Sequence, residues 1–141
     1  MNLFQKRKTK KRMEKLWGFC EYHIMEYEKR CSYTAPSCLP DLKKQIWKMI
    51  NFYADEIRDW NDDEVDYDKI SHSLISHSSF DLLASGRYHL YAGMLNPMSC
   101  AMKIKTVYEL NMEYALETGE LTKEEMEEQF RFLQKRIKEM G

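Results

Sequence analysis

The sequence has few of the residues that interrupt helices. Its 141 residues include only five glycines and three prolines, whereas strand-rich domains use such residues at their many turns. Apolar residues recur instead every three or four positions, which is the spacing of one face of an α-helix. The length fits one domain. We therefore predict an all-α protein, an irregular bundle of five or six helices in a single domain.

Long apolar runs are also absent. No stretch approaches the roughly 18 residues that cross a bilayer, and no apolar segment of the kind found in secretory signals follows the basic residues near the N-terminus. The sequence thus predicts a cytoplasmic protein without a membrane partner. In that reducing compartment the four cysteines, Cys20, Cys31, Cys38 and Cys100, are expected to be free thiols.

Recognisable catalytic motifs are missing as well. The chain has no G-x-S-x-G elbow, no glycine-rich phosphate loop and no H-E-x-x-H motif. Cys20 and His23 lie one helical turn apart, but Cys31 is more than about 10 Å further along the same helix, too far to share a zinc ion. We therefore predict that the protein is not an enzyme and has no catalytic residue, metal or cofactor.

Two acid–histidine pairs occur between residues 68 and 81. Asp68 precedes His72 by four positions, and His77 precedes Asp81 by four, a spacing at which side chains meet on a helix. The two histidines point to different sides of a continuous helix and converge only if the chain bends near Ser78. Local pairing on a polar face is the favoured interpretation, and proton transfer is the alternative.

Apolar stripes and capping signals locate the helices. The first two are joined by a short loop and are expected to pack as an antiparallel pair. Thr122 and Glu125 form a T-x-x-E capping box that begins the last helix, and Gly119 ends the one before it. Apolar stripes predict the other helices over residues 13–31, 39–60, 67 to an interruption near Ser78, and 98–118.

Charge is distributed unevenly, although the net charge is only −1. Residues 1–12 form a basic N-terminal arm or helix extension, and residues 13–141 form the bundle domain. Clustered cations of this kind can neutralise backbone phosphates. The candidate nucleic-acid-binding residues are Lys6, Arg7, Lys8, Lys10, Lys11 and Arg12.

An acidic segment, residues 55–68, has the opposite charge, with eight carboxylates against the single cation Arg58. We call it the acidic elbow. A concentrated negative surface can attract a positively charged protein partner, whereas a solvated helix junction is the simpler alternative. The candidate partner-binding residues in the elbow are Asp59, Asp62, Asp63, Glu64 and Asp66.

Residues 87–97 are a second candidate for partner binding. They combine aromatic, arginine and methionine side chains, which are enriched at protein interfaces. Arg87, Tyr88 and Tyr91 are the candidate contact residues. The same segment can equally belong to the core.

In general style the chain resembles small proteins carried by bacteriophages and mobile elements of gut-type bacteria, being short, helical, rich in Tyr and Met, and ending in a capped amphipathic helix. The resemblance implies a protein that modulates another macromolecule, such as an inhibitor of a host defence nuclease. We therefore predict a small non-enzymatic interaction protein with a protein partner. The alternative is a nucleic-acid-binding accessory protein that uses its basic N-terminal segment.

Overall fold

The computed structural model describes residues 2–30, 39–85, 97–120, 122–125 and 128. All regular secondary structure within these ranges is helical, which confirms the predicted all-α fold. No helix among them combines the length and the apolar character that crossing a bilayer requires. The helices are α1 (Leu3–Lys29), α2 (Leu39–Phe52), α3 (Ala54–Arg58), α4 (Tyr67–Ser85) and α6 (Pro97–Glu117).

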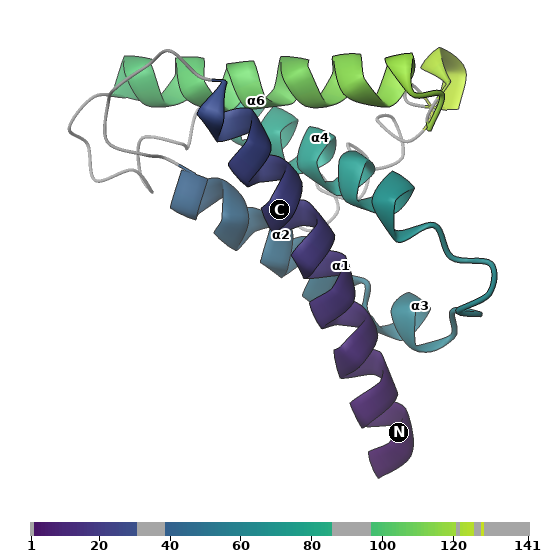
Figure 1. Cartoon of the computed structure of the whole chain (residues 1–141). Helices are drawn as coiled ribbons and strands as arrows, with labels where there is room; N and C mark the ends of the chain where they lie inside the picture. Colours follow the sequence, from purple (N-terminus) through teal and green to yellow (C-terminus); the bar gives the residue numbers. More distant parts are fainter. Residues whose placement is uncertain (1, 31–38, 86–96, 121, 126–127, 129–141) are drawn as a thin grey trace.

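Helix α4 lies at the centre of the arrangement and packs against α1, α2 and α6 (Figure 1). The predicted apolar stripes face one another across these contacts and form one main core, with a small second cluster at Met112 and Ala115. Burying such side chains contributes roughly 1.5–3 kcal/mol each. The largest fully buried aliphatic side chains are Leu16, Ile24, Leu42, Ile46, Ile50, Ile57, Ile75, Leu82 and Ile104.

Helix α1 begins inside the basic segment. Asn2 is its N-cap: the Asn2 side chain accepts a hydrogen bond from Gln5 N at 2.8 Å, and Asn2 N donates to the Gln5 side chain at 3.1 Å. This reciprocal pair satisfies two backbone groups that a helix start leaves open. Residues 3–12 are therefore the first turns of a 27-residue helix.

The helix predicted over residues 39–60 is divided at Tyr53. Helix α2 ends at Phe52, and the short helix α3 follows. At the junction Tyr53 N donates to both Met49 O and Ile50 O, at 3.1 and 3.2 Å. At the other end of α3, the carbonyls of Ile57 and Arg58 accept hydrogen bonds from a distant arginine on α1. The division accompanies long-range contacts that apolar periodicity does not encode.

The interruption predicted near Ser78 is wrong, because α4 continues to Ser85. The serine hydroxyls do not cap a new helix. Ser79 Oγ donates to Ile75 O at 2.7 Å, within the same helix, and the buried Ser78 Oγ contacts Met49 Sδ at 3.1 Å. The hydroxyl groups are thus satisfied without a break in the backbone.

The signals after α6 are confirmed. Gly119 follows the helix with φ 71°, a left-handed conformation that suits glycine. Thr122 N donates to Glu125 Oε1 at 3.3 Å, and Glu125 N donates to Thr122 Oγ1 at 3.0 Å. Both bonds of the predicted capping box are therefore present. Most of the helix that they begin lies outside the described residues.

Candidate metal centre

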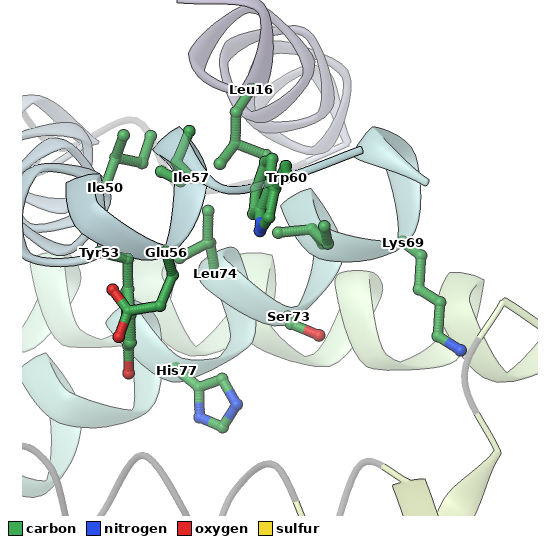
Figure 2. A pocket seen from close by; sticks show the side chains of 11 residues that line it. Leu16, Ile50, Tyr53, Glu56, Ile57, Trp60, Lys69, Ser73, Leu74 and His77 are labelled. Carbon is green, nitrogen blue, oxygen red and sulfur yellow. The ribbon is translucent and has the colours of Figure 1, made fainter. Parts of the chain in front are cut away.

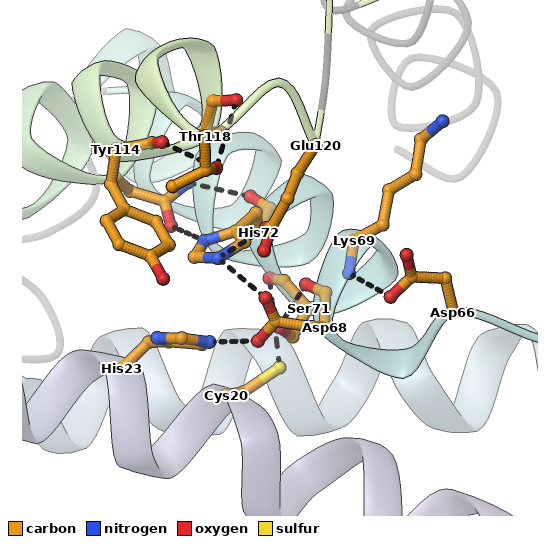
Figure 3. A network of polar contacts seen from close by, with 12 residues as sticks. Cys20, His23, Asp66, Asp68, Lys69, Ser71, His72, Tyr114, Thr118 and Glu120 are labelled. Carbon is orange, nitrogen blue, oxygen red and sulfur yellow. Dashed lines mark hydrogen bonds and ion pairs between the residues drawn. The ribbon is translucent and has the colours of Figure 1, made fainter.

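A buried polar cluster lies where α1, α4 and the residues after α6 meet (Figure 3). Helix α1 supplies His23, α4 supplies Asp68 and His72, and Glu120 follows the turn at Gly119. His72 is completely buried and His23 nearly so. We call His23, Asp68, His72 and Glu120 the His–carboxylate cluster.

Asp68 lies between the two imidazoles of the cluster. Its Oδ1 is 2.6 Å from His23 Nε2, and its Oδ2 is 3.5 Å from His72 Nε2. Glu120 Oε2 lies 3.0 Å from the same His72 nitrogen. The ring centroids of His23 and His72 are 4.2 Å apart. The Nε2 atoms of both histidines therefore face carboxylate oxygens in one small volume.

Asn111 of α6 fixes the protonation of His72. Asn111 Nδ2 donates to the backbone carbonyl of His72 at 2.8 Å and to Ser76 Oγ at 2.7 Å. A carbonyl only accepts, so these bonds fix the orientation of the amide and leave Asn111 Oδ1 facing His72 Nδ1 at 2.7 Å. His72 Nδ1 must therefore carry a proton. In the neutral ring the lone pair is then on Nε2, which points at the carboxylates.

In this arrangement, hydrogen-bond acceptors face one another. His72 Nε2 and Glu120 Oε2 are buried, and no ordinary hydrogen-bond donor reaches either atom from the described residues. Burial and the adjacent Asp68 raise the pKa of Glu120 to about 8, while burial lowers the pKa of His72. A proton on Glu120 or a bound cation would each resolve the conflict.

The cluster brings together side chains of the kinds that ligate metals. Ligand atoms of His23, Asp68 and His72 all lie within 4.8 Å of one another. Tetrahedral zinc, with ligand distances near 2.0–2.2 Å, needs ligand atoms about 3.3 Å apart, so small side-chain movements suffice. Metal-bound histidines usually donate their other ring N–H to an oxygen, as His72 does to Asn111. These residues are therefore able to hold a metal ion.

One side of the cluster is partly open to solvent. The side chains of Asp68 and Glu120 are 28% and 20% exposed. The ring of Tyr114, which is also partly exposed, lies beside both imidazoles, with centroids 5.0 Å from His72 and 6.0 Å from His23. The two carboxylates are thus the more exposed part of the cluster, and their negative charge would attract a cation.

His77 is separated from the cluster by the body of α4. It lines a mainly apolar cavity of about 330 Å³ together with Leu16, Ile57 and Trp60 (Figure 2). His72 and His77 thus lie on different sides of a continuous helix, as their five-residue spacing requires. Burial lowers the pKa of His77 to about 3.

The buried His77 makes stability depend on pH. It stays neutral in the folded protein, with a pKa of about 3, and protonates near its ordinary pKa of 6.5 once unfolded. The unfolded state therefore binds more protons below pH 6.5, so folding weakens as the pH falls from 6.5 toward 3. We expect His77 to account for about 2 kcal/mol of lost stability between pH 7 and pH 5.

Urea unfolding of the wild type and His77→Gln at pH 7 and pH 5 measures this contribution. The variant should lose less stability between the two pH values, because other titrating groups are common to both proteins. An identical pH dependence in the two proteins would show that His77 does not contribute.

Arg12 differs from the other predicted nucleic-acid-binding residues because its guanidinium is used inside the fold. Its Nε and Nη2 donate to the two carboxylate oxygens of Asp62 at 2.9 and 3.1 Å, and its Nη1 donates to Ile57 O and Arg58 O at 3.1 and 2.7 Å. The hydrogen bonds and charge of Asp62 outweigh burial and raise the pKa of Arg12. We call Arg12, Asp62 and these carbonyls the Arg12 clamp.

The remaining predicted cations are exposed. They occupy the first three turns of α1, before the Arg12 clamp. The predicted nucleic-acid contact of these residues stays a prediction. They are Lys6, Arg7, Lys8, Lys10 and Lys11.

The carboxylates of the acidic elbow have different surroundings. Asp59 pairs with Arg58 at 3.0 Å, and Asp66 Oδ1 accepts a hydrogen bond from Lys69 N at the start of α4. Asp63 and Glu64 are exposed. Part of the elbow therefore serves the fold itself, and its predicted role in partner binding stays a prediction.

Several other predicted residues lie outside the described part of the chain. These are Arg87, Tyr88 and Tyr91 of the second candidate surface, together with Cys31 and Cys38.

Cys20 is described. It is a buried free thiol, as predicted, and burial raises its pKa.

Sequence patterns identified only part of the His–carboxylate cluster. The Asp68–His72 spacing is visible in the sequence, whereas sequence spacing relates His23 only to the cysteines. No local pattern marks Asn111 or Glu120, because each reaches the cluster only when α6 packs against α4.

In comparisons with protein-family models, with curated proteins and with solved structures, the chain matches none.

Proposed function

We propose that this protein binds one divalent transition-metal ion through His23, Asp68 and His72, with Glu120 as an adjacent fourth ligand. The observation that carries the proposal is the orientation of His72. Asn111 holds its Nδ1–H, so the ring directs an unprotonated Nε2 toward two carboxylates. An imidazole lone pair beside carboxylate oxygens is a set of donor atoms that such a cation completes.

The chemistry of the donor atoms favours zinc. Two imidazole nitrogens suit Zn²⁺ and other late first-row ions, whereas Ca²⁺ and Mg²⁺ prefer sites made of oxygen alone. Among the described side chains the nearby cysteine is Cys20, whose thiol contacts Ser71 O on α4 and is not part of the cluster. Competition with Ni²⁺, Co²⁺ and Fe²⁺ is expected, since similar ligands serve all of them.

A metal at this position would join separate parts of the fold. His23 is on α1, whereas Asp68 and His72 are on α4. Binding only to the folded protein adds about 2.7 kcal/mol of stability when the free metal is at 100 times the dissociation constant. The role we propose is thus a metal clamp within a non-enzymatic interaction protein, and it replaces the sequence-based expectation of no metal.

Calorimetric titration of chelator-treated protein with Zn²⁺ tests the proposal. We expect one site per chain and a higher melting temperature on binding. Co²⁺ should give visible absorption that reports nitrogen and oxygen ligands. The variants His23→Gln and Asp68→Asn should each weaken binding by at least about 10–100-fold, because each removes a direct ligand.

The matched control is His77→Gln, which changes a buried histidine of α4 away from the cluster. It should bind Zn²⁺ like the wild type. The proposal fails if folded protein shows no saturable binding, or if His23→Gln and Asp68→Asn bind as tightly as the control.

A further inference from the structure

The first three turns of α1 carry positive charge without a nearby acidic residue in the sequence. The five exposed cations lie between Lys6 and Lys11, and the first carboxylate of the chain is Glu14. The first turn also has the partial positive charge of a helix N-terminus. We call residues 6–11 the basic end of α1.

The cations occupy the face of the helix that the fold leaves free. At about 100° per residue, the five side chains cover an arc of about 200°. Thr9 and Arg12 point in the opposite direction, and both are buried. Packing therefore uses one face of this segment, and the charged arc faces solvent.

The basic end is held at a fixed angle to the bundle. The Asn2–Gln5 capping box begins the turn of α1 that precedes it, and the Arg12 clamp, which follows it, joins the helix to α3 and the elbow. Figure 1 shows the purple end of α1 extending beyond α3. The cations are thus presented on a preorganised helix, which lowers the entropy cost of binding.

We propose that the basic end of α1 binds the phosphate backbone of nucleic acid, independently of the metal site. An α-helix about 10–12 Å across fits the major groove of a duplex, which is about 12 Å wide. Cations on a wide arc can reach phosphates on both sides of a groove. Contacts of this kind carry no sequence information, so binding is expected to be non-specific.

The distribution of apolar residues argues against a membrane surface. Interfacial helices place a broad apolar face opposite their charges. The face opposite these cations is packed against the fold. The large apolar residues exposed near these cations are Leu3 and Phe4, in the turn that precedes the basic end.

Fluorescence anisotropy with a labelled 20-base-pair duplex, with and without Zn²⁺, tests the inference. If all five cations contact phosphate, the logarithm of affinity should fall with the logarithm of salt concentration with a slope of about −4.5. A variant with all five cations changed to glutamine should lose at least about 100-fold in affinity at 0.1 M salt. The residues changed are Lys6, Arg7, Lys8, Lys10 and Lys11.

A control variant removes the same number of positive charges from other parts of the chain. Its affinity for the duplex should fall by less than about threefold. Circular dichroism checks that both variants fold. Equal losses in the two variants, or no binding by the wild type, would overturn the inference. Tighter binding of the basic end to anionic phosphatidylserine vesicles than to the duplex would also overturn it. The control changes Lys29, Lys43, Lys44, Lys48 and Lys105 to glutamine.

Discussion

Replacing Asn111 with leucine is expected to lower the free energy of unfolding by about 3–4 kcal/mol. Asn111 is fully buried, and its amide bonds to His72 Nδ1, His72 O and Ser76 Oγ. Tyr27 Oη also donates to Asn111 Oδ1 at 3.3 Å. Leucine has a similar volume but leaves these buried groups without their partner, at a cost of about 1–3 kcal/mol for each unsatisfied group.

The same substitution should weaken Zn²⁺ binding by about 10–100-fold, because His72 loses the oxygen that orients its ring. Urea unfolding of the metal-free protein separates the effect on stability from the effect on binding. The double variant His72→Phe/Asn111→Leu should be destabilised by less than the sum of the single variants, since both polar partners are removed together. If Asn111→Leu changed the free energy of unfolding by less than about 0.5 kcal/mol, the proposed role of Asn111 as the partner of these buried groups would be contradicted.

Changing Arg12 to methionine should lower the free energy of unfolding by about 3 kcal/mol. Methionine retains an apolar stem of similar length, so the main loss is the set of hydrogen bonds to Ile57 O, Arg58 O and Asp62. Bonds from a charged donor are worth about 1.5–3 kcal/mol, and a buried carbonyl left without its donor adds to the cost.

Lys11→Met is the matched control for Arg12→Met. The substitution changes an adjacent cation that is exposed. The free energy of unfolding of this variant should therefore stay within about 0.5 kcal/mol of the wild-type value. Chemical denaturation compares the two variants under the same conditions. Equal stabilities would show that the Arg12 clamp contributes little. In the duplex assay the single Lys11 change should have the larger effect, because Arg12 is occupied within the fold.

The helices were predictable because their signals are local. Three- and four-residue spacing of apolar side chains defines a face within a few turns, and the chain keeps that spacing through Leu16, Cys20 and Ile24. Thr122 and Glu125 satisfy each other's backbone groups three residues apart. Gly119 adopts a conformation that other residues rarely take. Such interactions need no tertiary partner, so a sequence alone can indicate them.

Continuity of the helices was less predictable. Serines favour caps when considered locally, but Ser78 and Ser79 are satisfied by a neighbouring helix and by the preceding turn. The division at Tyr53 is likewise accompanied by bonds from Arg12, some 45 residues away in sequence, to the end of α3. At Ser78 and at the end of α3, the partners come from other helices, and such contacts compete with local preferences of comparable energy.

The sequence by itself determined the helical fold, the caps and the segregation of charge, since each depends on neighbours within a few positions. Only the tertiary structure decided which polar residues meet. His23 lies 45 residues from Asp68, and Asn111 lies 39 from His72. A hydrogen bond between such residues exists only after the helices pack, because apolar burial, rather than any polar motif, sets how α1, α4 and α6 lie against one another.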